Sequence, residues 1–521
     1  MKKLIALTLA SLMLLTGCSS APKTEGNETT PTPEAAATEA DVIVVGAGGA
    51  GMTAAIEAAN AGKSVIVIEK AAMTGGNTTR STGGVNAANT PEQDKNEFTE
   101  GAGVEKMLAS AKESYPDLAD LVATVEAQWE EYQANPTGYF DTEELFMLDT
   151  LVGGKNLNDH ALVEVLANEA KNGIEWLKTV DADLSQVGSF GGASVKRIHK
   201  PVNDEGKTVA VGSYLVPKLT KAAEGKGIQF VMETAATELV VTDGKVTGVK
   251  AGETTYTGKA VVLATGGFAA NTEMVLQYKP DYEGFVCTNA PGMTGDGIVM
   301  AQAIGADTVD MEQIQIHPTV SQETSALITE GLRGDGAILV NSEGKRFFDE
   351  VGTRDAVSAA EVAQPGGFAW LIVDNKMVEA SSVIAGYIKQ GLTVEGAGVE
   401  ALAAAMGVDG AALVETMDKW NACVEAGKDE EFGRTSFANK LDEGPYYAIK
   451  VAPGVHHTMG GLKINPNTEV LDASGNAIAG LYAAGEVTGG VHGANRLGGN
   501  AVADIIVFGR IAGQQAAAYA E

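Results

Sequence analysis

The sequence predicts an α/β protein whose main domain is assembled from distant parts of the chain and is split by a smaller α+β domain. Three observations predict this. A strand, a glycine-rich turn, a helix and a second strand follow one another at residues 41–69. Another apolar strand at 261–267 ends in paired glycines, and a third such element occupies 480–486. Continuous apolar runs are typical of buried parallel strands. We therefore expect these elements to assemble one site, with an insertion between them.

The first element has the spacing of a dinucleotide-binding turn. Its strand, at 42–45, leads into Gly46, Gly48 and Gly51 in the pattern GxGxxG. These glycines permit the tight turn, the approach of a pyrophosphate to the backbone, and close packing of helix on strand. The start of the helix offers amide groups and a partial positive charge to phosphate. Glu69 ends the second strand, where a carboxylate accepts hydrogen bonds from ribose hydroxyls. A dinucleotide site is predicted, with a purely structural βαβ unit as the alternative.

Composition limits the function classes. The net charge of −31 excludes a nucleic-acid binder, which needs a basic face. It also disfavours electrostatic attachment to anionic lipid. The three cysteines, Cys18, Cys287 and Cys423, are too few for a disulfide framework or a four-cysteine zinc site. No CxxCH haem motif occurs, and we expect no metal site. Glycine, at 64 of 521 residues, suits turns and places where the backbone approaches a ligand.

The N-terminal segment has the pattern of an export signal. Two lysines precede an apolar run at 4–15, which is too short to span a bilayer. The sequence Leu-Thr-Gly-Cys that ends at Cys18 resembles a bacterial lipobox. Residues 1–18 are therefore predicted to be a lipoprotein signal peptide with Cys18 lipidated, and an ordinary signal peptide is the alternative. Residues 19–40 lack bulky apolar side chains and are predicted to be a disordered tether.

Longer runs carry a family resemblance. The three glycine-bearing elements resemble the glutathione-reductase-like class of FAD-binding domains. From Asp41 to its end the chain is similar to the flavoprotein part of soluble fumarate reductases of the flavocytochrome c type, in the succinate dehydrogenase and fumarate reductase superfamily. The runs that carry this similarity include 315–319, 329–334, 353–355, 453–461 and 486–500. The resemblance implies an FAD-dependent oxidoreductase that acts on CH–CH bonds.

The resemblance also assigns the residues that contact FAD. Besides the glycine turn and Glu69, they are Ala50, Asn77, Thr78, Gly83, Gly84, Asp296, His457, Glu486, Ala501 and Val502. No histidine lies in the segment 77–86, where relatives with covalently bound flavin carry theirs. The FAD is therefore expected to be noncovalent.

Reduction of an alkene by a flavin sets the demands on the substrate site. Flavin N5 supplies hydride, a conjugated carboxylate polarises the alkene, and a proton must reach the other carbon. Arginine suits the carboxylate because it binds it bidentately and stays charged. By the resemblance, the residues that contact the substrate are His317, Thr329, Glu330, His456, Arg496 and the backbone at Gly499.

Three further residues are assigned to proton transfer by the resemblance. Arg354 matches the proton donor of the family, and Glu330 and Arg333 match the relay that returns a proton to it. An arginine acid is unusual, since the pKa of a guanidinium is above about 12. The same arginine would also hold a carboxylate and stabilise developing charge.

The sequence departs from the family pattern in three respects. Without a haem motif, electrons are expected from a separate cytochrome, flavin or quinol-linked protein. Residues 91–150 carry 15 acidic residues and 3 lysines. We interpret them as a solvated helical insertion, with a docking surface for a basic electron donor as the alternative. Phe190 and Leu327 stand where fumarate reductases have methionines, which favours an acid with an apolar substituent.

The expected plan has FAD-binding parts at 41–311 and 457–521 around a clamp (capping) domain at 312–456, with the substrate between them. We expect an extracytoplasmic, lipid-anchored reductase of a small α,β-unsaturated mono- or dicarboxylate, serving anaerobic respiration. Fumarate is the leading substrate, and methacrylate, acrylate, an aryl-acrylate and urocanate are alternatives. A flavin electron-transfer lipoprotein and a 3-ketosteroid dehydrogenase are the alternative functions.

Overall fold

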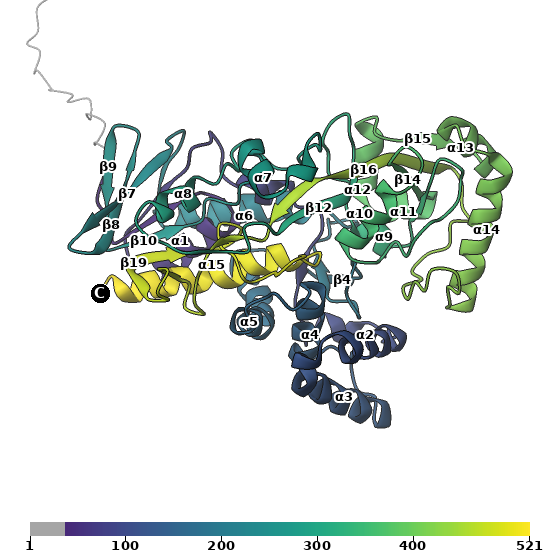
Figure 1. Ribbon diagram of the computed structural model, residues 1–521, viewed down its shortest axis with the longest axis horizontal. Coiled ribbons are helices and arrows are strands. Elements are labelled where there is room, and N and C mark those ends of the chain that lie inside the picture. Colours follow the sequence, from purple (N-terminus) through teal and green to yellow (C-terminus); the bar gives the residue numbers. More distant parts are fainter. Residues whose placement is uncertain (1–36) are drawn as a thin grey trace, which may run out of the picture. The chain divides into compact units, whose positions relative to one another are not determined.

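A six-stranded sheet forms the base of the larger part of the molecule (Figure 1). In the computed structural model, which describes residues 37–521, the strand order is β18 (Glu469–Leu471), β19 (Ala477–Ala483), β10 (Ala260–Leu263), β1 (Val42–Val45), β2 (Val65–Ile68) and β6 (Gln229–Val231). Neighbouring strands from β19 to β6 are parallel, and β18 at the edge is antiparallel. Ligands of parallel sheets bind beyond the carboxyl ends of the strands. The glycine turn that follows β1 lies at this end.

Two helices from opposite ends of the chain pack closely beside this sheet. They are α1 (Gly49–Asn60) and α15 (Asn500–Tyr519). A side chain at Gly513 would place its Cβ 2.2 Å from the carbonyl oxygen of Ala54, so only glycine permits this contact. The loop before α15 is thereby held next to the glycine turn before α1. Helices α5 (His160–Lys178) and α6 (Val211–Gly225) pack against α15 and α1, respectively.

A second, antiparallel sheet belongs to the smaller part of the molecule. Its order is β12 (Ile314–Val320), β16 (Tyr446–Thr458), β14 (Ala369–Val373) and β13 (Ile338–Val340), and β15 (Val394–Gly396) also pairs with β16. An apolar core separate from that of the first sheet joins it to its helices. These helices are α9 (Gly331–Gly334), α10 (Arg354–Val362), α11 (Asn375–Ala380), α12 (Ser382–Lys389), α13 (Val399–Met406) and α14 (Gly410–Ala426).

Strand β16 passes through the expected boundary between clamp and FAD-binding parts. Its first half pairs with β14, and its second half pairs with β12, where His457 lies opposite Gln315. The strand is the long arrow that runs from the clamp toward the middle of the molecule in Figure 1. The two histidines at its end are therefore held by the same sheet that supports the clamp. The boundaries at 311 and 456 stay predictions.

The acidic segment at 91–150 contains three helices, α2 (Gly101–Ser114), α3 (Ala119–Ala134) and α4 (Glu143–Gly153). They enclose their own apolar core, and they project from the rest of the described chain in Figure 1. A buried ion cluster fastens the segment to the neighbouring loop. In this cluster Arg197 lies 2.7 Å from Asp141 and 2.8 Å from Asp149, and all three side chains are fully buried.

Smaller elements complete the described chain. They are η1 (Gly76–Arg80), β3 (Val85–Asn86), η2 (Gln93–Lys95), η3 (Pro116–Leu118), β4 (Gln186–Gly188), β5 (Ile198–Lys200), β7 (Ala236–Thr242), β8 (Lys245–Ala251), β9 (Thr254–Thr257), α7 (Thr272–Tyr278), η4 (Pro280–Tyr282), α8 (Asp296–Gln302), β11 (Thr308–Val309) and β17 (Gly461–Leu462). Within residues 37–521, no helix has both the length and the apolar character needed to cross a membrane. The predicted signal peptide, with Cys18, and most of the predicted tether lie outside the described residues.

Candidate active site

One cavity of about 640 Å³ joins the glycine turn after β1 to polar side chains of the clamp. The predicted residues that line it are Gly46, Gly48, Ala50, Glu69, Asn77, Thr78, Gly83, Gly84, Asp296, His317, Thr329, Glu330, Arg354, His456, His457, Glu486, Arg496, Gly499, Ala501 and Val502. Gly51 and Arg333 stand behind this wall. The structure thus brings together residues that the sequence separates by several hundred positions.

The nucleotide end of the cavity is built from backbone and one carboxylate. Gly46 has a φ of +104°, and a Cβ there would lie 2.3 Å from the Ala264 oxygen. A Cβ on Gly51 would lie 1.9 Å from the oxygen of Gly46. The carboxylate of Glu69 accepts hydrogen bonds of 2.8 Å from the amides of Ala47 and Ala71. This places a buried carboxylate beside a bare glycine turn, and that arrangement fits the ribose and pyrophosphate of a dinucleotide.

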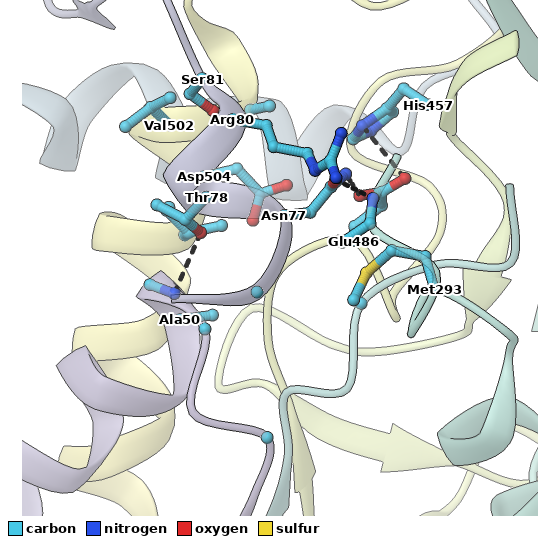
Figure 2. A pocket seen from close by; sticks show the side chains of 18 of the residues that line it. Ala50, Asn77, Thr78, Arg80, Ser81, Met293, His457, Glu486, Val502 and Asp504 are labelled. Atoms are coloured by element: carbon cyan, nitrogen blue, oxygen red, sulfur yellow. Dashed lines mark hydrogen bonds and ion pairs between the residues drawn. The ribbon is translucent and has the colours of Figure 1, made fainter. Parts of the chain in front are cut away.

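Polar side chains converge at the next part of the cavity (Figure 2). Glu486 accepts a hydrogen bond of 3.1 Å from the Thr458 amide and lies 3.4 Å from Nδ1 of His457. Asn77 donates to Glu486 at 3.5 Å and to Asn289 at 2.7 Å. Burial raises the pKa of Glu486 to about 7. Burial, Arg496 and His492 lower the pKa of His457 well below its usual value.

These groups fit a flavin. His457 is neutral at physiological pH, and its Nε2 is buried without a hydrogen-bond partner in the described part of the chain. Flavin rings present both hydrogen-bond donors and acceptors, so an unpartnered ring nitrogen at the cavity wall is an apt contact. Behind it, His492 pairs with Asp504 at 2.9 Å. Sequence reasoning gave His492 no role and missed Asp504, which lines the cavity.

At the clamp end, Arg354 is held by two partners. It donates to both oxygens of Glu330, at 3.2 and 2.9 Å, and to the side-chain oxygen of Gln315 at 2.9 Å. Glu330 also accepts from Arg333 at 2.9 Å. Burial would raise the pKa of Glu330, but Arg354 and Arg333 outweigh it and hold the pKa below its usual value. Glu330 is therefore an ionised carboxylate between two guanidinium groups.

Glycine makes room for this carboxylate. A Cβ on Gly498 would lie 2.0 Å from an oxygen of Glu330.

Gln315 connects the two sides of the site, because its amide also donates to the backbone oxygen of Arg496 at 2.7 Å. Sequence reasoning gave Gln315 no role. The feature of the sequence that could have indicated a role is its position two residues before His317 on the same strand.

No carboxylate within residues 37–521 pairs with Arg496. Its side chain is 3% exposed, it donates to the Leu497 oxygen at 3.1 Å, and its Nε has no partner among the described residues. Burial, and then the neighbouring Arg354, lower the pKa of Arg496 to about 9. It remains a cation at neutral pH. A buried guanidinium without a counterion is a site for an anion.

Two histidines complete the anion site. The rings of His317 and His456 meet edge to face with centroids 5.0 Å apart. Burial and Arg354 lower the pKa of both well below the usual value, so both are neutral. Nδ1 of His317 accepts from the Thr319 amide at 3.2 Å, which leaves the proton on Nε2. That Nε2–H is buried and free to donate to a ligand.

Comparisons with known proteins identify the family of the chain. A model of the family described as FAD binding domain matches residues 41–134 and 131–502. Fumarate reductase (cytochrome) of Shewanella frigidimarina is 43% identical over 92% of this chain and 77% of that protein. Urocanate reductase of Eggerthella lenta is 35% identical over 98% of this chain and 82% of that protein. NADH:acrylate oxidoreductase of Vibrio harveyi is 38% identical over 91% of this chain, which spans half of that protein.

A solved structure shows that the fold is also similar to that of a fumarate reductase. The open conformation of a flavocytochrome c3 fumarate reductase superposes with a TM-score of 0.68 at 40% identity. The match covers 92% of this chain and 78% of that one. The predicted α/β fold class and the FAD cofactor are confirmed. The chain belongs to the FAD binding domain family and is an FAD-dependent oxidoreductase related to the fumarate reductases.

Proposed function

We propose that the protein reduces the carbon–carbon double bond of a small α,β-unsaturated carboxylate, with fumarate as the first candidate. The observation that carries the proposal is the unpaired, buried cation Arg496. With Arg333 and Arg354 it gives three guanidinium groups near one ionised carboxylate, Glu330. The two charges left over match a dicarboxylate dianion. Bidentate pairing of arginine with carboxylate would orient the substrate as well as bind it.

The proposed roles of the other residues follow from their contacts. FAD, bound noncovalently at the glycine turn, supplies the hydride when it is reduced. Arg496, His317 and His456 hold the carboxylates with neutral and charged donors. They also stabilise the negative charge that develops on the carboxylate side during reduction. Thr329 and the Gly499 backbone border the same space.

Arg354 is the proposed proton donor. Glu330 binds it bidentately and fixes the direction of its N–H bonds, while Gln315 holds its third nitrogen. When Arg354 gives its proton to the developing carbanion, Glu330 passes on a proton that it takes from Arg333, at 2.9 Å. The guanidinium of Arg333 is fully buried, so another group must return a proton to it.

A second substrate class is favoured by the apolar wall of the cavity. Phe190 and Leu327 line it, and Phe190 is only 3% exposed. An aromatic ring suits an acid with a flat or apolar substituent better than it suits a second carboxylate. Urocanate or an aryl-acrylate is therefore the second candidate. A flavin protein that only passes electrons would need neither the anion site nor the buried relay.

The test is a panel of enoates assayed with FAD-loaded protein and reduced methyl viologen. At least one member is expected to be reduced, and Arg354→Ala is expected to abolish its reduction. Arg510→Ala, on the same chain but paired with Glu169 away from the cavity, is the control. Full turnover by the Arg354→Ala variant would refute the role of Arg354. Absence of turnover for every enoate by FAD-loaded wild-type protein would favour the electron-carrier function.

We propose in addition that the protein works outside the cytoplasm, anchored through Cys18, and takes electrons from a separate cytochrome, flavin or quinol-linked protein. The lipobox-like sequence before Cys18 supports the anchor. Cys18→Ala is expected to move the protein from the membrane fraction to the soluble fraction of an extracytoplasmic extract. Retention in the membrane fraction would refute lipid anchoring. We also propose that residues 312–456 act as a clamp that closes on the substrate.

A further inference from the structure

We infer that Glu361 is the outer member of the proton route, and that it refills Arg333, and through it Arg354, from solvent. The inference rests on the proposed reduction, because only a reaction that consumes a proton at Arg354 needs such a route. Glu361 does not line the cavity and therefore acts through other residues. It is a positioning residue in the sense that it supplies protons without touching the substrate.

The first observation is the buried face of α10 (Arg354–Val362). The helix begins at Arg354, and Ser358 and Glu361 follow at positions i+4 and i+7, which lie on the same side of a helix. Ser358 and Glu361 are fully buried, and so is Val357, which precedes Ser358. A polar stripe thus runs inside the clamp from the proposed proton donor to the last turn of the helix.

The second observation is a group of buried polar atoms that lack partners within residues 37–521. They are both carboxyl oxygens of Glu361, the hydroxyl of Ser358 and Nε of Arg333. Buried polar groups are almost always hydrogen-bonded, so several exceptions on Arg333 and on the helix that begins at Arg354 require an explanation. Water molecules bound to these atoms would satisfy them and would also carry protons between them.

The third observation connects Glu361 to the relay. Arg333, from α9, is the charged group that acts on Glu361, and the Ala369 amide of β14 approaches its carboxyl group without completing a hydrogen bond to either oxygen. Burial raises the pKa of Glu361 well above its usual value, against the opposing effects of Arg333 and this amide. Burial likewise lowers the pKa of Arg333, which Glu330 and Glu361 partly restore. Burial therefore favours the protonated form of Glu361, and it also makes the guanidinium of Arg333 lose its proton more readily than usual.

The fourth observation is the closeness of solvent. Glu361 occupies the last turn of α10, and the next residue, Val362, is 50% exposed. Val362 borders a groove of about 670 Å³ together with Gly366, Gly367 and Phe368. A proton from water at this groove has only the end of one helix to pass before it reaches Glu361.

The proposed transfers balance. Arg354 gives a proton to the substrate carbanion and is refilled through Glu330 by Arg333, which becomes neutral. Glu361 then gives its carboxyl proton to Arg333 through a water molecule between them, and becomes a carboxylate. Water at the groove returns a proton to Glu361. One proton from solvent is used per alkene reduced, and no group is oxidised or reduced in the route.

The experiment compares wild-type protein with Glu361→Gln. The amide keeps the shape and polarity of the side chain but cannot act as an acid. FAD content and the thermal midpoint of unfolding establish that the variant is folded. Glu361→Asp keeps an acid at this position and serves as the second variant, and Glu343→Gln, exposed on the clamp surface, is the matched control. Two rates are measured: a single turnover of pre-reduced protein mixed with the enoate, and steady-state kcat with reduced methyl viologen.

Glu361→Gln is expected to leave the single-turnover rate and KM unchanged, because Arg354 already carries its first proton. Steady-state kcat is expected to fall by about 10- to 100-fold, within the usual effect of a lost proton-transfer group. Formate, a small acid able to enter the groove, is expected to restore part of kcat in Glu361→Gln and to have no effect on wild-type protein. The solvent deuterium isotope effect on kcat is expected to increase in the variant.

Steady-state turnover equal to that of wild-type protein would overturn the inference while leaving the proposed function intact. Equal slowing of both rates, without rescue by formate, would also overturn it, because a structural defect has that signature. If Glu361→Gln does not fold, the same comparison is made with Glu361→Leu, which removes the acid and suits a fully buried position. Inactivity of wild-type protein toward all enoates would instead count against the proposed function.

Discussion

Arg496→Met separates the binding role of Arg496 from its effect on stability. Methionine has a similar length, is apolar and adapts to irregular space. The substitution removes one hydrogen bond, to the Leu497 oxygen, and the only cation of the site that has no carboxylate partner in the described chain. We expect the variant to be at least as stable as wild-type protein and unable to bind the enoate.

The magnitude follows from the pKa of Arg496. Its lowering to about 9, by roughly 3 to 4 units at 1.36 kcal/mol per unit, means that keeping this cation in the ligand-free protein costs about 4–5 kcal/mol. Loss of the hydrogen bond to Leu497 offsets about 1 kcal/mol. The variant should therefore gain up to a few kcal/mol in the free energy of unfolding. Residues that serve function often reduce stability in this way.

The assay is thermal unfolding of FAD-loaded, oxidised protein at pH 7, with and without fumarate. Wild-type protein is expected to gain about 2.7 kcal/mol at a fumarate concentration of 100 times Kd. The Arg496→Met variant should start from a higher midpoint and show no response to fumarate. Arg510→Met is the matched control, since Arg510 is 17% exposed, lies on α15 and pairs with Glu169.

Two outcomes would refute this reasoning. A large drop in the midpoint of the ligand-free variant would show that Arg496 already has a stabilising partner. A response to fumarate equal to that of wild-type protein would show that the dicarboxylate binds elsewhere. Either result would remove the observation on which the proposed function depends.

Three further predictions concern pH, FAD and the acidic segment. KM for fumarate should stay constant below pH about 9 and should rise by up to about tenfold per pH unit above it. The reason is that the protonated form of Arg496 binds the anion, and this form is lost as pH rises through the pKa. A KM that stays constant up to pH 10 would contradict this. Gly51→Ala should abolish FAD binding, measured as flavin content, because its Cβ would lie 1.9 Å from the Gly46 oxygen; normal flavin content would show that the turn can move. Arg197→Met should lower the free energy of unfolding by about 3–5 kcal/mol, measured with urea, because Asp141 and Asp149 would be left buried without a cation; a change below 1 kcal/mol would show that water reaches the carboxylates.

Local sequence predicted the parts of the fold that depend on neighbouring residues. The strand Val42–Val45, the turn with Gly46 and Gly51, and the following helix need only a few residues each, and all are found as expected. Glu69 was placed correctly beside the turn because strand length fixes where the second strand ends. The split of the FAD-binding part was also visible, since its three strand elements share one pattern.

Contacts between distant segments were not predictable from one sequence. Gln315 joins Arg354 to the backbone of Arg496, across 39 positions on one side and 181 on the other. Nothing in the sequence next to Arg197 marks it as buried, yet its side chain is fully buried between two carboxylates. Glu361 follows an ordinary amphipathic pattern in which a glutamate is normally exposed. In each case the side chain's partner is set by the tertiary fold and leaves no local pattern.

The net charge of the chain also fails to predict the site, because its sign is opposite to that of the local charge at the site. A chain with −31 gives no hint of an anion site, yet Arg333, Arg354 and Arg496 gather around the carboxylate of Glu330. Exposed acidic residues more than about 10 Å away are screened by salt and hardly affect this cluster. Burial removes that screening, so local imbalance rather than total charge decides which ligand enters. The strength of the site therefore depends on how well the clamp excludes water, which ties substrate affinity to the packing of β12, β16 and α10.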